Sequence, residues 1–208
     1  HFNSKPMNMK QTLFFMLLSL TYLTTLFSQN TETWYRYPAI SPDGKWIVFS
    51  SQGDLYKVSA DGGAAVMLTK NDAFDFAPVW SHDSKTIAFA SARYGNFDIF
   101  TIPAEGGNAV RITMHSNDDI PYDFSADDKS VLFKSVRMDA STNQQFPTGA
   151  LPELYQVEIK TGKLSQILTT PAENARYSKD WTMLYYHDAK GYEDPLRKHH
   201  TSSVARDV

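Results

Sequence analysis

The stretch YPAISPDGKWIVFSSQGDLYKVSADGG, from Tyr37 to Gly63, decides the fold of this chain. It contains a Pro-Asp-Gly turn, a short apolar run, a Gly-Asp step, a second apolar run and a Gly-Gly pair. Short apolar runs bounded by such turn residues predict β-strands, and the spacing leaves no room for a helix. The stretch is therefore a lone hairpin or one unit of a repeating structure.

The Ser-x-Asp part of the stretch recurs, which decides in favour of a repeat. Its copies are ISPDGKWIVFS from Ile40, WSHDSKTIAFA from Trp80, FSADDKSVLFK from Phe124 and YSKDWTMLYYH from Tyr177. The segments that follow repeat as well: GDLYKVSADGGAAVMLT from Gly53, FDIFTIPAEGGNAVRIT from Phe97 and PELYQVEIKTGKLSQILT from Pro152. Three full copies and a half-copy, at intervals of roughly 40 to 50 residues, indicate an array of equivalent units.

Each copy predicts four strands. The first strand ends at Ser-x-Asp, whose aspartate is able to accept a hydrogen bond from the backbone two residues on. Runs such as KWIVFS and DLYKV predict the second and third strands, and a Gly-Gly pair allows the tight turn into the fourth. Four antiparallel strands in about 40 residues are typical of a propeller blade. We therefore predict an all-β propeller over residues 29–208, with blades near 34–70, 71–114, 115–170 and 171–208.

The number of blades points to a fragment. A propeller closes on itself, commonly with about four to eight blades, because closure protects its strand edges. The fourth copy is unfinished at Val208. We expect a longer parent protein, of which this chain is a part truncated after about three and a half blades.

The N-terminal region has the pattern of a secretory signal peptide. Met9 and Lys10 lead into the apolar run LFFMLLSLTYLTTLF, and the small residue Ser28 follows. We expect residues 1–28 to be a signal peptide with an upstream remnant. The mature domain is then exported, to the periplasm or outside the cell, with no membrane contact after cleavage. An uncleaved membrane anchor is the alternative.

Composition excludes several classes of function. The net charge of −3, from 20 basic and 23 acidic residues, provides no basic field for nucleic acid. The absence of cysteine excludes disulfides, thiolate zinc sites and a cysteine nucleophile. We predict no cofactor and no metal, since the groups around His82, His115 and His187 lack typical ligand spacing.

Two patterns that resemble catalytic chemistry have simpler explanations. The four motif aspartates are Asp43, Asp83, Asp127 and Asp180. Catalytic carboxylates work as one asymmetric pair, whereas these recur in equivalent places, so we assign them to turn architecture. The pair Ser202-Ser203 near two histidines lacks a Gly-x-Ser-x-Gly elbow, and neighbouring strand residues point to opposite faces. We therefore predict no catalytic residue in this chain.

The loops between strands are the candidate contact sites. The second-blade loop SARYGNFD is expanded in the third blade to SVRMDASTNQQFPTGALPE, and an insertion in one repeat often maps to a binding face. A tolerated surface insertion is the alternative. The fourth-blade loop HDAKGYEDPLRKHH mixes aromatic and basic residues that suit a peptide carboxylate or a neighbouring domain. The predicted contact residues are Arg93, Tyr94, Asn96, Arg137, Phe146, Arg197, Lys198, His199 and His200.

The repeat resembles a known family of propellers. Ser-Pro-Asp-Gly-Lys turns followed by strands that start with Asp-Ile are similar to the TolB-type repeat from about Tyr37 onward. A narrower resemblance rests on WYRYPAISPDGKWIVFSSQGDLYKV, ARYGNFDIFTIPAEGG, FPTGALPELYQV and KGYEDPLRKHHTSSVARDV. These segments resemble the first propeller of bacterial tricorn-type serine peptidases, which are related to tail-specific proteases.

The resemblance implies a six-bladed, non-catalytic propeller at the front of an exported serine peptidase, a hydrolase whose catalytic residues lie in a later region. Such a domain controls peptide access or product exit and takes part in domain assembly. The implied partners are peptides or unfolded polypeptides, other domains of the same chain, and further copies in a homo-oligomer. Two alternatives stay open: a TolB-like periplasmic interaction propeller with no enzyme attached, and the propeller of a prolyl-oligopeptidase-type peptidase.

Overall fold

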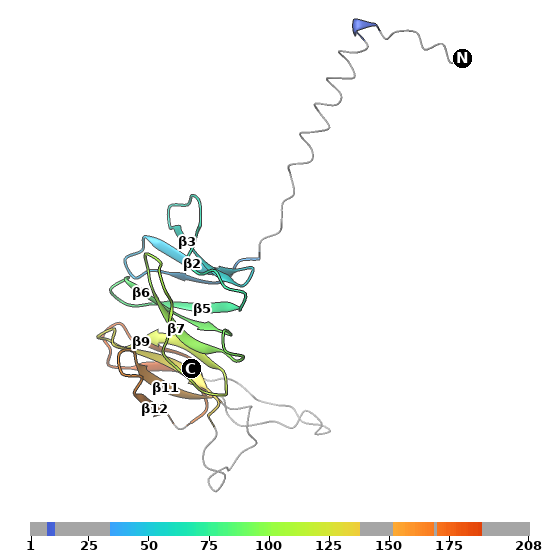
Figure 1. Cartoon of the computed structure of the whole chain (residues 1–208). Helices are drawn as coiled ribbons and strands as arrows, with labels where there is room; N and C mark the ends of the chain where they lie inside the picture. The colour runs from blue at the N-terminus through green and yellow to red at the C-terminus, as the bar shows by residue number, and fades with distance from the viewer. Residues whose placement is uncertain (1–7, 11–33, 138–151, 169, 189–208) are drawn as a thin grey trace, which may run out of the picture. The chain divides into compact units, whose positions relative to one another are not determined.

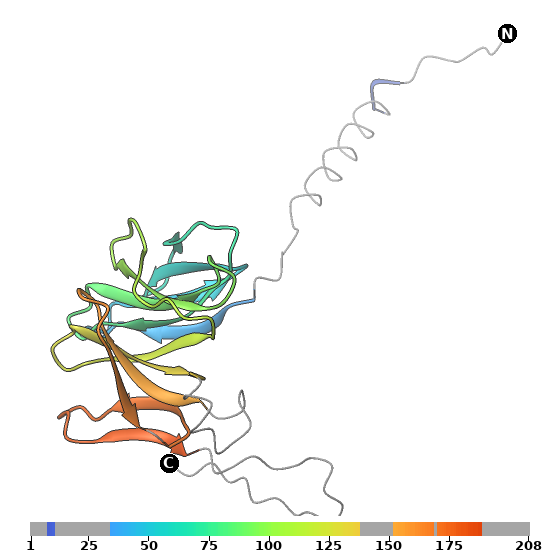
Figure 2. The same cartoon turned by 60° about the horizontal axis from the view of Figure 1, so that its bottom comes forward.

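The described part of the chain is built of consecutive β-sheets. The structure, a computed structural model, describes residues 8–10, 34–137, 152–168 and 170–188. The described residues from Trp34 to Asp188 form one compact unit, in which the sheets follow one another in chain order (Figures 1 and 2). The apolar core of the predicted signal peptide, residues 13–27, lies outside the described residues. Within those described, no helix is both long and apolar enough to cross a membrane.

Each sheet is one copy of the repeat. The first blade contains β1 (Arg36–Ile40), β2 (Trp46–Ser51), β3 (Asp54–Ser59) and β4 (Val66–Met67), paired in that order. The second contains β5 (Asp75–Trp80), β6 (Thr86–Ser91), β7 (Asp98–Pro103) and β8 (Val110–Arg111). The third contains β9 (Asp119–Phe124), β10 (Ser130–Ser135), β11 (Glu153–Glu158) and β12 (Leu164–Leu168). The fourth is described as β13 (Ala172–Tyr177) and β14 (Leu184–Asp188). All pairs are antiparallel, so the all-β prediction of four-stranded blades is confirmed.

The blades pack face to face through apolar side chains. Between the first two blades, Val48 and Leu55 meet Trp80, Ile87 and Phe89. The next core joins the second and third blades, and a third core joins the third and fourth. The first strands of neighbouring blades, β1, β5, β9 and β13, contact one another in sequence. These four strands therefore form the inner wall of the array.

The first blade carries one apolar face that no described blade covers. Successive side chains of a strand point to opposite faces of the sheet. Val48 points toward the second blade, so its neighbour Phe49 points away from that blade. Tyr56 of β3 is paired with Phe49 and lies on the same face. The residue just before the motif serine shows most clearly that the first blade differs from the others in how well this face is covered. Ile40 is 62% exposed, whereas Trp80 and Phe124 in the equivalent places are 6% and 0% exposed.

The Ser-x-Asp turns have the same hydrogen bonds in all four blades. In the second blade, the Ser81 hydroxyl donates to Asp83 Oδ1 (2.7 Å) and accepts from the Thr86 amide (2.9 Å). Asp83 Oδ1 also accepts from the Lys85 amide (3.0 Å), two residues on, as predicted. The same bonds form around Ser41, Ser125 and Ser178. The assignment of the repeated aspartates to turn architecture is therefore confirmed.

The fourth position of each turn requires a left-handed backbone. Its occupants are Gly44, Ser84, Asp128 and Trp181, with φ of 73°, 60°, 55° and 64°. Glycine adopts this conformation without strain, which explains the Ser-Pro-Asp-Gly sequence of the first blade. The three other residues need a further contact to hold the same conformation.

Removing one motif hydroxyl is expected to destabilise the domain. Ser81 is 1% exposed, so Ser81→Ala leaves the part-buried Thr86 amide without its side-chain acceptor. We expect the free energy of unfolding to fall by about 1–3 kcal/mol, measured by urea denaturation of the full-length protein. Ser116→Ala, at an exposed serine, is the control. Equal midpoints for the two variants would show that the turn bond is not needed.

Candidate functional site

The inner strands of all four blades line a groove of about 480 Å³. Its lining is mainly apolar and aromatic, with Tyr37 from β1, Phe76 from β5, and Ile120 and Tyr122 from β9. The Tyr37 and Phe76 rings pack together with their centroids 5.3 Å apart. An apolar hollow with a few polar groups is the usual form of a binding site, so this groove is the candidate site.

A bulge in each inner strand shapes the groove wall. The pairing register shifts within β1, β5 and β13, where Tyr37, Ala77 and Asn174 have φ of 53°, 51° and 51°. The third blade also has a register shift, but Pro121 stands at the equivalent position and its ring fixes φ at a negative value. Left-handed non-glycine residues store strain and cluster at functional positions. Three such residues around one groove support its choice as the candidate site.

Two cations lie at the groove, each near a carboxylate of another blade. Lys134 Nζ is 3.4 Å from Glu173 Oε1, and Arg176 Nη1 is 3.9 Å from Asp123 Oδ1. Both contacts join the third and fourth blades. Arg176 is 59% exposed, so its guanidinium retains donors that face solvent.

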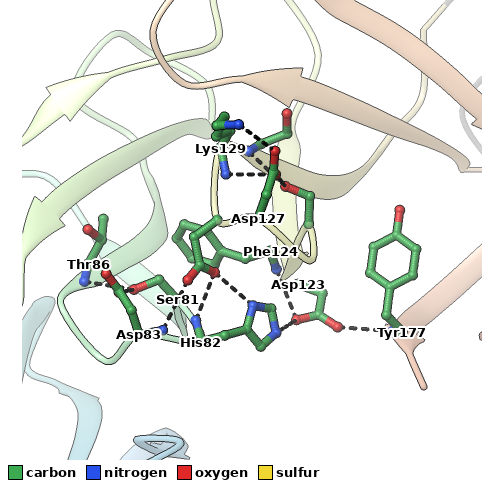
Figure 3. Close-up of polar contacts among 12 residues, drawn as sticks. Ser81, His82, Asp83, Thr86, Asp123, Phe124, Asp127, Lys129 and Tyr177 are labelled. Atoms are coloured by element: carbon green, nitrogen blue, oxygen red, sulfur yellow. Dashed lines mark hydrogen bonds and ion pairs between the residues drawn. The ribbon is translucent and has the colours of Figure 1, made fainter. Parts of the chain in front are cut away.

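Asp123 connects the groove to a cluster shared by three blades, shown in Figure 3. The Asp123 carboxylate is largely buried and accepts hydrogen bonds from the Tyr177 amide of β13 (3.0 Å) and the Phe124 amide (2.9 Å). The same carboxylate lies 3.7 Å from Nε2 of His82, in the second blade. One side chain of the third blade therefore joins both of its neighbours.

His82 is held on its other side by the left-handed residue of the third blade. Its Nδ1 lies 2.7 Å from Asp128 Oδ1, and its own amide donates to the same oxygen (2.8 Å). The Asp83 amide donates to the second oxygen of Asp128 (3.0 Å). The His82 ring also meets the Trp181 ring of the fourth blade edge to face, at 4.3 Å. In the first blade the Asp43 amide donates to Ser84 in the same way (3.3 Å). In the second and third blades, the fourth turn residue thus binds the turn of the blade before it.

Hydrogen bonding and burial shift several pKa values in this region. The Ser125 hydroxyl, followed by Lys129, lowers the pKa of Asp127 from 3.8 to about 2. The motif serines likewise lower the pKa of Asp43, Asp83 and Asp180. Burial, and then the charge of Asp123, raises the pKa of Tyr177. The motif carboxylates are therefore ionised at neutral pH and serve as acceptors.

Two predicted contact residues, Arg93 and Arg137, are engaged inside their blades. Arg93 Nη2 donates to Asp75 Oδ2 (2.8 Å), and Arg137 makes the same contact with Asp119 (2.8 Å). Both aspartates are fully buried, and the Arg93 guanidinium lies over the Phe100 ring at 4.9 Å. Sequence reasoning missed these pairs. The signal was available, since each aspartate precedes its motif serine by the same number of residues and each arginine follows a Ser-x step.

The other predicted contact residues of the second blade flank this pair. Tyr94 is 64% exposed and lies under the Arg111 guanidinium at 4.2 Å. Asn96 Nδ2 donates to the carbonyls of His115 (2.9 Å) and Asn117 (3.0 Å) and so braces the loop. Phe146, Arg197, Lys198, His199 and His200 lie outside the described residues. In the part of the chain that the structure describes, no group of three or more acidic or histidine side chains could hold a metal ion.

Comparison with known proteins gives the family. A family model described as the tricorn protease N-terminal beta propeller domain matches residues 32–206. The chain belongs to this family. The resemblance to tricorn-type propellers is thereby confirmed. No curated protein matches the chain.

Solved structures similar to this tricorn-type propeller include two TolB proteins. The putative TolB from Agrobacterium tumefaciens is 21% identical with a TM-score of 0.64, over 76% of this chain and 55% of that one. TolB from Acinetobacter baumannii is 20% identical with a TM-score of 0.59, over 74% and 38%. The tricorn protease is 16% identical with a TM-score of 0.51, over 73% and 20%. The chain thus spans about half, or less, of these proteins, and likeness at such identity shows the fold alone.

Loss of the Asp123 carboxylate is expected to loosen the fourth blade. Asp123→Ala removes the acceptor of the Tyr177 amide and leaves His82 and Arg176 without this partner. We expect faster hydrogen–deuterium exchange in residues 172–188 and unchanged exchange in residues 36–67. Asp61→Ala, at an exposed turn, is the control. If residues 172–188 exchange at the same rate in Asp123→Ala as in the control variant, Asp123 does not hold the fourth blade to its neighbours.

The shifted pKa of Asp127 predicts acid sensitivity with a definite sign. A carboxyl whose pKa is lowered on folding stabilises the fold above its unfolded pKa, and this contribution is lost as the pH falls through the folded value. For Asp127 the loss spans pH 3.8 to about 2. We expect the thermal unfolding midpoint of Asp127→Asn to lie below that of the wild type at pH 7. Near pH 2 we expect the two midpoints to become similar. A difference that stays constant across this range would refute the assignment.

Proposed function

We propose that this propeller is a non-catalytic domain of an exported tricorn-like serine peptidase, where it controls peptide access or product exit and contributes to domain assembly. The observation that carries the proposal is the family match over residues 32–206, to a propeller that stands at the N-terminus of a protease. The proposed location, the periplasm or the exterior of the cell, follows from the signal-like sequence Met9–Ser28.

The groove supports the access part of this proposal. It runs across the inner strands of four blades, and its aromatic and aliphatic lining suits the side chains of a peptide or an unfolded polypeptide. The network of Asp123, His82 and Trp181 links three of those blades, and Asp123 lies 3.9 Å from Arg176 of the groove lining. A wall linked in this way keeps its shape while a peptide passes.

Domain assembly involves the loops that carry the predicted contact residues. We assign docking of the parent's other domains to Arg197, Lys198, His199 and His200, because the loop is basic and aromatic. Further copies of the chain in a homo-oligomer are included among the proposed partners, and nucleic acid is not, given the net charge of −3.

A bulky side chain in the groove tests the access role. In the full-length protein, Ile120→Trp narrows the groove at β9 and is expected to lower kcat/KM for long peptides several-fold while hydrolysis of a dipeptide-sized substrate is unchanged. Val66→Trp, on the exposed strand β4, is the control. Both assays are run with and without a serine-directed inhibitor.

The outcomes separate the candidate functions. Inhibitor-sensitive hydrolysis that loses only long substrates in Ile120→Trp supports an access domain. Equal loss for both substrate sizes, or none, leaves the propeller without a gating role. A full-length protein that hydrolyses no peptide is instead a TolB-like interaction propeller with no enzyme attached.

A further inference from the structure

The inner strands offer free edges to the groove, but those edges are unsuited to pairing with a peptide strand. β1, β5, β9 and β13 each stand at the end of their sheet and pair on one side. A regular free edge is a template for an added strand, which it binds through alternating amides and carbonyls. Whether a peptide binds here in that way depends on how regular these edges are.

Prolines and bulges interrupt the edges in every blade. Pro38, Pro78 and Pro121 lie in the groove wall and have no amide hydrogen to donate. Next to the first two, Tyr37 and Ala77 have left-handed φ values that turn the backbone out of the extended form. The fourth blade has the same break at Asn174, with φ of 51°. No inner strand therefore presents a continuous ladder, and a peptide in the groove must be held by side chains.

The side chains that line the groove provide aromatic surface and hydrogen-bond donors. Two successive blades contribute the partly exposed rings of Tyr37 and Phe76, and Tyr122 of the third blade, which is 9% exposed, adjoins them in the lining. Tyr37 is 47% exposed, so one face of this ring is open to a ligand. The third and fourth blades also contribute Lys134, which is half-buried, and the exposed Arg176 to the lining, and the N–H groups of both can donate to carbonyl oxygens.

This combination matches a peptide in the polyproline II conformation. Such a peptide has no internal hydrogen bonds, needs no partner strand and presents its carbonyls to outside donors. Its pyrrolidine rings pack on aromatic side chains, and because the conformation is already formed it loses little entropy on binding. We propose that the groove binds proline-rich extended segments in this conformation. The inference rests on the proposed function, that the propeller contacts peptides, and names the class of peptide.

The test compares two labelled peptides on the full-length protein. Fluorescein-labelled decaproline is the probe, and a decamer of alternating serine and glutamine with the same label and blocked ends is its match. We expect decaproline to bind roughly tenfold more tightly by fluorescence anisotropy, because the flexible peptide must be ordered on binding. Hydrolysis of unlabelled peptides is measured on the same preparation.

A groove variant shows whether the aromatic wall is responsible. Tyr37→Asn removes the ring and retains a residue that tolerates positive φ, so the strand keeps its bulge. We expect it to weaken decaproline binding about threefold to tenfold. The control is Tyr94→Ala, which removes an exposed tyrosine that is not part of the groove lining.

Each outcome either supports or overturns the inference that the groove binds proline-rich segments. Preference for decaproline that is lost in Tyr37→Asn and kept in Tyr94→Ala supports the inference. Equal binding of the two peptides overturns the inference. A preference for decaproline that Tyr37→Asn does not change overturns it as well. Neither of these results contradicts the proposal that the propeller contacts peptides. If neither peptide binds while peptides are still hydrolysed, the groove is not the peptide site and the inference fails. If neither binding nor hydrolysis is seen, the proposed function fails with it.

Discussion

In each blade the hydroxyl of the motif serine is held between the carboxylate two residues on and the amide five residues on. These two bonds fix the turn that joins the inner strand to the rest of the blade. The inner strand in turn carries the groove lining, and in the second and third blades the left-handed residue of the turn binds the preceding blade, as Asp128 binds the turn at His82. Blade geometry, blade contact and groove shape therefore all depend on one local hydrogen-bonding pattern. Because this pattern needs only Ser, Asp and a residue that tolerates positive φ, the surrounding sequence is free to vary between blades.

The repeat made the architecture predictable from sequence. The strands follow the apolar runs that flank Ser41, Ser81 and Ser125, and the Gly62-Gly63 turn has the positive φ values that its sequence requires. Local chemistry was sufficient for these features, since each strand pairs with its neighbour in sequence. The family followed from the same motifs. Repetition helped further. Catalytic carboxylates act as one pair, so the presence of four equivalent aspartates was enough to assign them to the turns.

The groove and the joining cluster were not predictable in the same way. His82 contacts residues of two other blades, Asp123 and Trp181, and no local pattern records which turns meet in space. The bulge at Tyr37 is also hidden, because an aromatic residue in a strand ordinarily implies extended backbone. Arg93 is a different case. Its position in a polar loop suggested a contact residue, whereas its guanidinium is paired with the buried Asp75, far enough along the chain for the pairing to be missed. Contacts between repeats therefore need coordinates, and even a pair within one repeat, such as Arg93 with Asp75, was recognised only in the structure.

The uncovered face of the first blade has a consequence for synthesis of the protein. As the chain leaves the ribosome, the second, third and fourth blades each find a described blade to pack against, whereas no described blade covers the other face of the first. The 62% exposed Ile40 and the half-buried Tyr56 remain on this uncovered face while the following residues are made. At about 5–20 residues per second, translation from Tyr56 to Asp188 takes roughly 7 to 26 seconds. During that interval the newly made first blade is a binding site for chaperones and a point of self-association between neighbouring nascent chains.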